Sequence, residues 1–155
     1  MTYSNETMTE TPTADDPKMA TVGDAARLLR GAGLRPTRQR LAHAPLLLAH
    51  RDRHVTAERL HQEAVASQVP VSLATVYNTL HQFTEAGLLR AVAVEGAKTY
   101  FDTNTSNHFH FFCENSADLL DIDTNAIRIE GLPEAPDGKM ISRVDVLVRL
   151  VDKDR

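Results

Sequence analysis

The chain has 155 residues, of which 42% are hydrophobic, and a formal net charge of -4 at pH 7. This length suits one domain or two small ones, and a unit below about 80 residues usually needs a metal, a disulfide or a partner chain. The single cysteine, Cys113, excludes an intramolecular disulfide, and no apolar run approaches the roughly 20 residues that span a bilayer. We therefore expect a soluble cytoplasmic protein without a membrane partner.

Charge is distributed unevenly along the chain. Residues 1–20 hold one basic and four acidic residues, residues 21–101 hold ten and six, and residues 102–155 hold six and eleven. The segment charges are therefore -3, +4 and -5, in agreement with the total of -4. The basic middle segment suits a polyanion and the acidic third segment suits cations, whereas the polar first segment should be a disordered tail.

Folded structure is predicted to begin with two helices. Apolar residues recur at helical spacing over residues 21–31, and a second helix is expected over residues 41–49 with a bend at Pro45. Three arginines, Arg35, Arg38 and Arg40, surround the start of the second helix. Basic side chains beside the open N–H groups of a helix start suit a phosphate, although a solvated charged loop has the same composition. We select Arg35 and Arg38 as the candidate phosphate contacts.

A third helix is predicted from the N-cap Thr56 to about Ser67. Its inward residues are expected to be Leu60, Ala64 and Val65. The short link that follows leads to a second N-cap, which begins the fourth helix.

The fourth predicted helix covers residues 73–86 and has two different faces. The apolar face comprises Leu73, Val76, Leu80 and Phe83. The opposite face lacks charge and bulk, as a helix that reads base edges in the major groove requires, whereas an ordinary solvated face usually carries Glu and Lys. The candidate groove-facing residues, including the N-cap and a flanking tyrosine, are Ser72, Ala74, Thr75, Tyr77 and Asn78.

A β-hairpin is predicted after the fourth helix, with strands at residues 88–94 and 98–101 and a turn between them. Helices of this kind closed by a hairpin form a winged helix, whose wing can contact the DNA backbone. The predicted fold class is therefore α+β, with a winged helix-turn-helix domain at residues 21–101. A small α/β domain is expected at residues 102–155.

The second domain contains a His-x-His motif on a predicted strand. Side chains alternate along a strand, so that His108 and His110 share one face, whereas Phe109, Phe111 and Cys113 should face the core. Two imidazoles on one face can bind one metal ion, although two surface histidines on a half-buried strand would show the same motif.

The rest of the second domain is expected to contain a strand at residues 119–122, a short helix at 124–130 and a strand at 141–151. The last strand alternates apolar and mixed residues. A segment of fewer than about 60 residues is a poor autonomous fold, so that pairing with a second copy of the chain is expected.

Several motifs resemble the ferric uptake regulator (Fur) family, with coverage of about residues 22–151. These motifs are Gly33–Arg40, His54–Glu58, Val71–Tyr77 and Ala86–Leu88. Within the family, the His-x-His setting and the segments Lys98–Asn104 and Glu114–Ser116 look most like the iron response regulator (Irr) branch.

This resemblance implies a dimeric bacterial transcription regulator and no enzyme. A winged helix would bind a double-stranded operator, the second domain would form a homodimer, and the output would track iron, in this branch largely through haem. Haem is an implied ligand, and a haem-biosynthesis enzyme is a further candidate partner.

The resemblance also implies one metal site between the domains. By position, its ligands are His54, Asp102, His108, His110 and Asp121. Such a nitrogen and oxygen donor set suits Fe(II), Mn(II) or Zn(II) without selecting strongly among them. Because the first ligand belongs to the DNA-binding domain, an ion would tie the two domains together.

Three departures from the family pattern change these expectations. Many members hold a structural zinc with paired Cys-x-x-Cys motifs, but Cys113 stands alone, so that a structural zinc held by four cysteines should be absent. A second regulatory site in the family uses the positions of Asn107 and Phe109, and Phe109 cannot ligate a metal. Asn78 stands where many members carry arginine, which indicates a different operator sequence.

Haem poses a geometric constraint, because its axial positions lie on opposite sides of the macrocycle. Two histidines on one strand face cannot occupy both, so we expect either His108 or His110 to bind haem in competition with the divalent ion. Two alternatives remain open. A Fur-family peroxide sensor would oxidise its own histidine ligands around Fe(II), and a non-haem iron oxygenase would use two histidines and one carboxylate.

Overall fold

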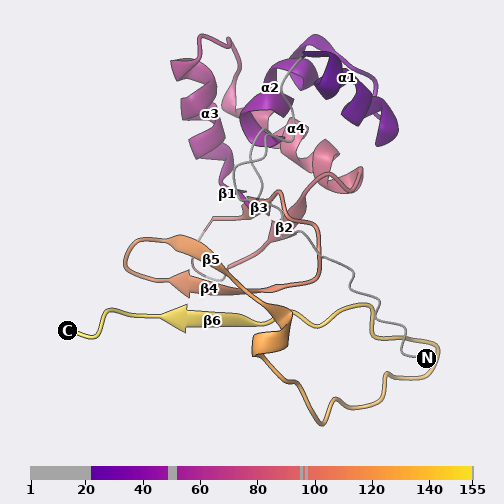
Figure 1. The fold of residues 1–155 in the computed structure, drawn as a ribbon, viewed down its shortest axis with the longest axis vertical. Coiled ribbons are helices and arrows are strands. Elements are labelled where there is room, and N and C mark those ends of the chain that lie inside the picture. The colour runs from indigo at the N-terminus through magenta and orange to yellow at the C-terminus, as the bar shows by residue number, and fades with distance from the viewer. Residues whose placement is uncertain (1–21, 49–51, 95, 97, 155) are drawn as a thin grey trace, which may run out of the picture. The chain divides into compact units, whose positions relative to one another are not determined.

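Figure 1 shows the fold in a computed structural model. The structure describes residues 22–48, 52–94, 96 and 98–154. The predicted tail, the N-cap Thr21 and the last predicted residue of the second helix, Ala49, lie outside these residues.

The chain forms two compact units. The first contains the residues up to Val92 together with Thr99–Asn104, and the second contains Ala93–Lys98 and Thr105–Arg155. Helices and a small sheet make up the first unit, and a second small sheet organises the other. The architecture is α+β, as the sequence predicts.

Among the residues that the structure describes, four helices build the first unit, close to the positions predicted from the sequence, although the second begins three residues earlier than predicted. They are α1 (Val22–Gly31), α2 (Arg38–Leu48), α3 (Ala57–Ala66) and α4 (Leu73–Glu85). The side chains of Thr56 and Ser72 accept backbone hydrogen bonds from the first turns of α3 and α4, which confirms both as N-caps. Pro45 lies inside α2. Gly87, with φ of 79°, follows α4 in the left-handed conformation that glycine adopts most readily.

The core of the first unit is formed by the apolar faces of these helices and by residues of the adjoining strands. Its largest fully buried apolar side chains are Leu29, Leu47, Leu48, Leu60, Leu80, Phe83 and Phe101. Two predictions of inward-facing residues are wrong. Val65 is 58% exposed, because at about 100° per residue it lies about 140° around α3 from Leu60. Leu73 is 37% exposed at the first position of α4.

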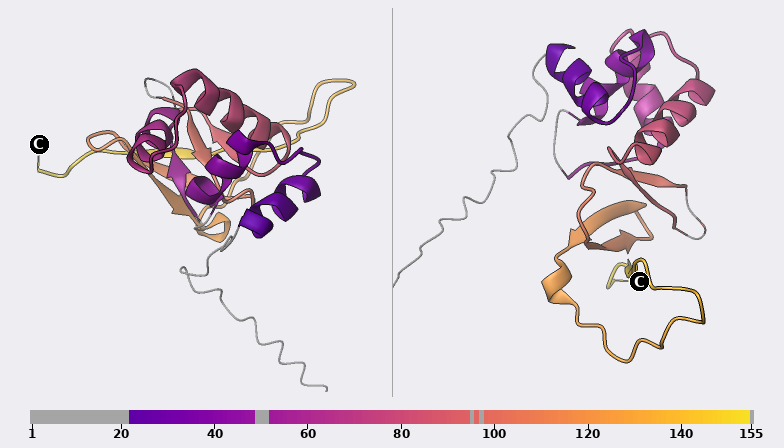
Figure 2. Two further views of the ribbon diagram at one scale, coloured as in Figure 1. Left: turned by 90° about the horizontal axis from the view of Figure 1, so that it is seen from above. Right: turned by 90° about the vertical axis from the view of Figure 1, so that its right-hand side faces the viewer.

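A three-stranded sheet completes the first unit. Its strands are β1 (His54–Val55), β2 (Arg90–Val92) and β3 (Tyr100–Asp102), in the order β1-β3-β2 with antiparallel pairing. The predicted hairpin corresponds to β2 and β3, whereas β1 is missed because two residues are too few to show alternation. In the views of Figures 1 and 2 the four helices gather on one side of this sheet.

The second unit contains a separate three-stranded sheet. Its strands are β4 (Phe109–Cys113), β5 (Asp118–Ile122) and β6 (Leu147–Leu150). The order is β5-β4-β6, with antiparallel pairing of β4 to β5 and parallel pairing of β4 to β6.

The predicted division of β4 into a histidine face and a core face is only partly right. Phe109 is buried, but Phe111 and Cys113 are only half-buried, and Phe112 on the histidine face is buried. Both faces lose exposure because β4 is the central strand, and because the guanidinium of Arg149 covers the Phe112 ring at 5.5 Å from its centroid.

The short helix predicted over residues 124–130 is wrong in length, because only a 3-10 turn, η1 (Thr124–Ala126), is present. The Asp123 carboxylate caps this turn by accepting a 2.8 Å hydrogen bond from the backbone N–H of Asn125. Ile127 then takes an extended conformation, with φ of -124° and ψ of 127°. A β-branched residue favours that conformation over a helix.

The last predicted strand, over residues 141–151, is also too long. Only Leu147–Leu150 form β6, in register with His110 to Cys113 of β4. A strand needs a partner for its backbone hydrogen bonds. Pairing therefore stops where β4 stops.

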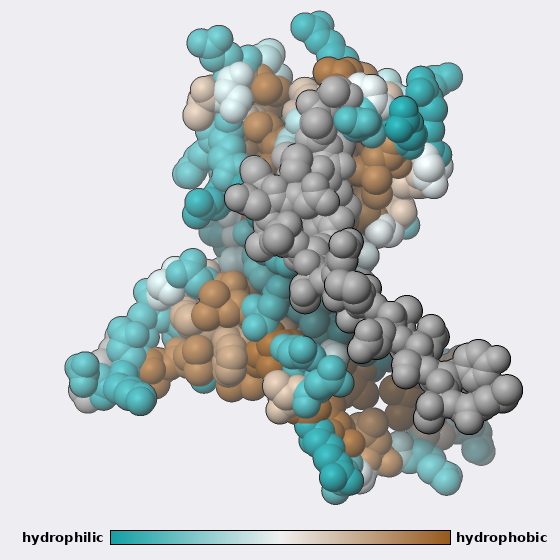
Figure 3. Space-filling model, in the orientation of Figure 1, coloured by the Kyte–Doolittle hydropathy of each residue, from teal (hydrophilic) through white to brown (hydrophobic). Residues whose placement is uncertain are grey.

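Large hydrophobic side chains remain exposed on the second unit. They are Leu120, Ile129, Leu132, Met140, Ile141 and Val151. Figure 3 shows hydrophobic residues gathered on the visible face over the strands of this unit. Among the helices in the described part of the chain, none is long and apolar enough to cross a bilayer.

Candidate metal site and DNA interface

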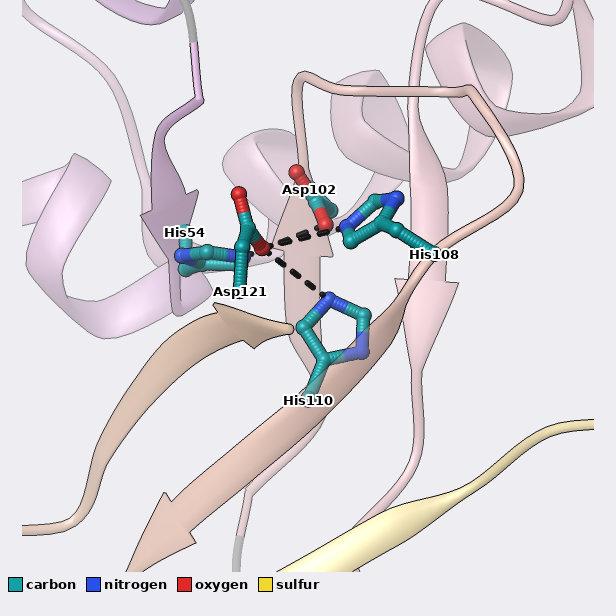
Figure 4. A group of neighbouring side chains, drawn as sticks. All are labelled: His54, Asp102, His108, His110 and Asp121. Carbon is teal, nitrogen blue, oxygen red and sulfur yellow. Dashed lines mark ion pairs between the residues drawn. The ribbon is translucent and has the colours of Figure 1, made fainter. Parts of the chain in front are cut away.

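Three of the predicted ligands converge within the second unit, as Figure 4 shows. In the antiparallel pairing of β4 with β5, His110 stands opposite Asp121, and His108 immediately precedes β4. The Nε2 atom of His108 lies 3.1 Å and that of His110 3.5 Å from the same oxygen, Oδ1 of Asp121. Strand register thus brings two imidazoles and one carboxylate to one point.

These separations fit the coordination shell of a metal ion. Two ligand atoms at about 2.1 Å from one ion are about 3.0 Å apart at a right angle and about 3.4 Å apart at the tetrahedral angle. The two imidazole rings lie 4.5 Å apart between centroids at an interplanar angle of 64°, so that they approach without stacking. The donor atoms of this trio therefore suit a cation such as Fe(II), Mn(II) or Zn(II).

The tautomer of His108 is set by its second nitrogen. The Nδ1 atom lies 2.8 Å from the backbone carbonyl oxygen of Ser106, which can only accept a hydrogen bond. In the neutral ring Nδ1 therefore carries the proton and Nε2 carries the lone pair that a metal needs. The sequence gives no indication of this contact with Ser106, because a backbone carbonyl leaves no signal in residue identity.

Both histidines of the trio are buried, at 6% exposed for His108 and 3% for His110. The alternative of two surface histidines is therefore wrong. A buried imidazole needs polar surroundings, and here Nε2 of both imidazoles lies beside the Asp121 carboxylate, whose side chain is 31% exposed.

The other two predicted ligands lie together in the first unit. His54 of β1 pairs in register with Asp102 of β3, and Nε2 of His54 is 3.1 Å from Oδ2 of Asp102. The other carboxylate oxygen, Oδ1, accepts a 2.8 Å hydrogen bond from the backbone N–H of Asn104. Asp102 is fully buried, where a carboxylate requires such partners. The five predicted ligands thus form a pair in the first unit and a trio in the second.

The predicted groove-facing residues lie on and beside α4. Ser72, Ala74 and Asn78 are exposed and Thr75 is half-buried, which leaves small polar side chains at this surface. Tyr77 differs, because it is half-buried, packs against the core, and donates a 2.7 Å hydrogen bond from its hydroxyl to the Glu58 carboxylate. Tyr77 therefore also joins α4 to α3, and its truncation to alanine would disturb packing as well as any DNA contact.

The start of α2 faces the same part of α4. A cavity of about 410 Å³ is lined by residues of both elements, among them Arg38, Thr75 and Asn78. Arg35 and Arg38 are exposed, and neither guanidinium forms an ion pair with any residue that the structure describes. Both are therefore available to an anion at this surface.

Arg40 has a different role from the two exposed arginines. Its Nε and Nη2 atoms donate to Oε1 of Gln82 at 3.2 and 3.0 Å, and Nη1 donates to the backbone carbonyl of Arg35 at 2.9 Å. It thereby braces the start of α2 against α4. From the sequence, Arg40 could be assigned only to the same group of possible phosphate contacts as Arg35 and Arg38. This bracing role was not predicted.

Comparison with known proteins identifies relatives of this chain. The model of the ferric uptake regulator family matches residues 31–136, a range that contains all five predicted ligands. The peroxide-responsive repressor PerR of Staphylococcus aureus is 34% identical over 93 residues, which is 60% of this chain and 62% of that protein. The chain thus spans about three fifths of the length of the curated relatives that it matches.

Solved structures show a similar fold. The ferric uptake regulator of Vibrio cholerae aligns with a TM-score of 0.64 at 22% identity, over 82% of this chain and 98% of that chain. The ferric uptake regulator of Pseudomonas aeruginosa, solved with manganese, aligns with a TM-score of 0.62 at 23% identity, over 83% and 98%. The family model covers most of the chain, and the fold agrees with it. This chain belongs to the ferric uptake regulator family.

Proposed function

We propose that this protein is a cytoplasmic, homodimeric regulator of transcription that controls iron and haem homeostasis. A double-stranded DNA operator binds at α4 and the start of α2, and a divalent metal ion sets the operator affinity. The ligands of this ion are His54, Asp102, His108, His110 and Asp121. The observation that carries the proposal is the convergence of both buried imidazoles on one oxygen of Asp121, at 3.1 and 3.5 Å.

The chemistry of the donor set supports a regulatory ion. The trio in the second unit supplies two imidazole nitrogens and a carboxylate, and the pair in the first unit supplies one of each. When bound, an ion would neutralise the carboxylates and cross-link the residues that hold it. Cross-linking ligands from two units would restrict their relative motion, and in this way metal status would reach the DNA-binding helices.

The chain itself supports a joint site for the pair and the trio. Only five residues separate Asp102 from His108. Even a fully extended chain of that length spans only about 20 Å, so that the pair and the trio stay within that reach whatever the arrangement of the units. We therefore propose one shared ion rather than two separate ones.

The operator interface is supported by the exposed surface of the first unit. Ser72, Ala74, Thr75, Tyr77 and Asn78 supply the groove-facing set, and Arg35 and Arg38 supply phosphate contacts. Small uncharged residues permit close approach to base edges, and the exposed guanidinium groups of Arg35 and Arg38 suit the DNA backbone. The exposed apolar side chains of the second unit supply a surface for the homodimer.

The test is operator binding with and without Mn(II). An operator duplex would be selected from a random-sequence pool by the protein in the presence of Mn(II), and its affinity measured by fluorescence anisotropy in both conditions. Mn(II) should raise the affinity of wild type, whereas the double variant His108→Ala/His110→Ala should bind equally weakly in both conditions. Equal affinity of wild type with and without Mn(II) would contradict the proposal.

Haem is the second ligand that we propose, in keeping with the resemblance to the Irr branch. The two imidazoles approach one oxygen from the same side of the sheet, so that one of them would serve as an axial ligand to haem and leave the metal. Haem titrated into Mn(II)-loaded protein should therefore release Mn(II) in proportion. Stoichiometric binding of both ligands without displacement would exclude competition for these histidines.

Peroxide sensing is a second candidate function, favoured by the 34% identity to a peroxide-responsive repressor. With Fe(II) bound, peroxide would then oxidise a histidine ligand, and mass spectrometry would detect added oxygen on His54 or His108. The trio also has the composition used by non-haem iron oxygenases, two histidines and one carboxylate. If the protein consumed oxygen together with a co-substrate over many turnovers, and not only once per protein, the oxygenase interpretation would be favoured instead.

A further inference from the structure

Arg53 contacts two helices of the first unit and Thr103, the residue that follows β3. Its backbone N–H donates a 2.8 Å hydrogen bond to Oγ1 of Thr103, and its carbonyl accepts a 2.9 Å hydrogen bond from the Thr103 N–H. Its guanidinium donates to the backbone carbonyl of Leu46 in α2 and to the carboxylate of Glu63 in α3. One residue thus connects the end of β3 to two helices.

The two helix contacts come from different nitrogens of one rigid group. Nη1 reaches Leu46 and Nη2 reaches Glu63, while the side chain as a whole is only 20% exposed. The Leu46 carbonyl lies near the C-terminal end of α2 as the structure describes it, where the helix dipole favours a cation. Because guanidinium is planar, its Nη1 and Nη2 donors keep a fixed geometry relative to each other, so that one rigid group ties α2 to α3.

The same backbone carries the pair of metal ligands proposed for the first unit. His54 follows Arg53 in the chain, and Asp102 precedes Thr103. The paired residues His54 and Asp102 therefore lie directly beside the hydrogen-bonded residues Arg53 and Thr103. A shift of His54 and Asp102 on metal binding therefore moves the Arg53 backbone directly. Its guanidinium transfers that movement to the end of α2 and to α3.

From those helices the connection continues to the operator surface. α2 begins at Arg38, beside the cavity that it shares with α4. α3 is tied to α4 by the hydrogen bond from Tyr77 to Glu58, and to the residues before α4 by the 3.0 Å contact of His61 Nε2 with the carbonyl of Val71. Both contacts of the Arg53 guanidinium therefore lead to elements of the proposed DNA interface.

We infer that Arg53 is a positioning residue that couples metal occupancy at His54 and Asp102 to the placement of the DNA-binding helices. This inference rests on the proposed function, because it assigns a route for the response to that metal site. Arg53 would contact neither the ion nor the operator. Arg53 would instead determine how strongly the metal changes operator affinity. For coupled sites this change is typically about 5- to 150-fold.

The test compares Arg53→Met with wild-type full-length protein. Mn(II) affinity is measured by calorimetry, and affinity for the selected operator duplex is measured with and without Mn(II). Arg53→Met keeps the aliphatic stem, so that Mn(II) should still bind, but the fold change in operator affinity should fall to less than about a third of the wild-type value. A purely structural role would lower the midpoint of urea unfolding and leave this fold change unaltered.

Arg59→Met provides the matched control. Arg59 also contacts Glu63, at 3.4 Å, but it lies on α3, is 72% exposed and, unlike Arg53, is not adjacent to β1 in the chain. This variant should respond to Mn(II) as wild type does. If Arg53→Met does not fold, Arg53→Lys replaces it, because lysine keeps the charge but presents a single ammonium in place of the fork and should also respond less than wild type.

The outcomes separate this inference from the proposed function. Failure of wild type to respond to Mn(II), or unchanged Mn(II) binding by Asp102→Asn, would overturn the metal site and the inference together. A wild type that responds, with Arg53→Met or Arg53→Lys responding by the same factor, would overturn the inference alone. Loss of the response in Arg59→Met as well would also overturn it, because the effect would then belong to the Glu63 ion pairs in general.

Discussion

The Tyr77 hydroxyl donates a 2.7 Å hydrogen bond to the Glu58 carboxylate, and this bond joins α4 to α3. It raises the pKa of Tyr77 above the ordinary value of 10.0, because only the protonated phenol can donate it. Burial and the negative charge of Glu58 shift the pKa in the same direction. The connection between the two helices is therefore sensitive to alkaline pH.

We predict a loss of stability at high pH that depends on Tyr77. Because the pKa is raised in the folded state, the contribution of this bond is fully present below about pH 10 and is lost as the pH rises through the folded-state pKa. Urea unfolding at several values between about pH 8 and 11.5 should show a steeper fall in the free energy of unfolding for wild type than for Tyr77→Phe, which cannot ionise. Equal slopes for the two proteins would contradict the prediction.

The N-caps of α3 and α4 allow stability to be separated from DNA recognition. The Thr56 hydroxyl accepts a 3.3 Å bond from the N–H of Arg59, and the Ser72 hydroxyl accepts a 3.2 Å bond from the N–H of Thr75. Thr56→Ala and Ser72→Ala should each lower the free energy of unfolding by about 1 kcal/mol. Only Ser72→Ala should also weaken operator binding, as measured by anisotropy with folded protein. A matching loss in Thr56→Ala would assign the effect to the cap.

Much of this fold could be predicted from local sequence, because the signals of its helices and hairpin are themselves local. Caps such as Ser72 and the glycine after α4 act within one turn, and the spacing of the apolar residues identifies the buried face of α4. The five ligands could also be selected, since the family resemblance supplies their positions. Composition cannot reveal a partner that is a backbone group, such as the Ser106 carbonyl, or a strand as short as β1. Nor does it show contacts over 42 positions, such as that of Arg40 with Gln82.

Contacts to phosphate and contacts to bases should respond differently to salt. The Arg38 guanidinium is exposed at the start of α2, and Asn78 is exposed on α4 beside the same cavity. Arg38→Gln should weaken binding to all sequences and reduce the slope of log affinity against log salt by about 1. Asn78→Ala should cost about 1 to 3 kcal/mol on the operator and leave the slope and the non-specific affinity unchanged. The measurement is titration of operator and random duplexes at several salt concentrations, and equal losses on both duplexes for Asn78→Ala would remove Asn78 from the reading set.

Two aspartates of β5 provide a matched test of the trio. Asp121 stands opposite His110 and has one carboxylate oxygen within 3.5 Å of Nε2 of both imidazoles, whereas Asp118 stands opposite Cys113 at the other end of the same strand and is exposed. Asp121→Asn removes the negative charge while keeping the shape, so that Mn(II) affinity should fall by more than the roughly 10- to 100-fold that follows the loss of an outer hydrogen-bond partner. Asp118→Asn should bind Mn(II) as wild type does, because it changes the charge of the same strand by the same amount without touching the imidazoles. Calorimetric titration of both variants measures the difference, and similar Mn(II) affinities for the two would show that general negative charge, and not the convergence on Asp121, attracts the ion.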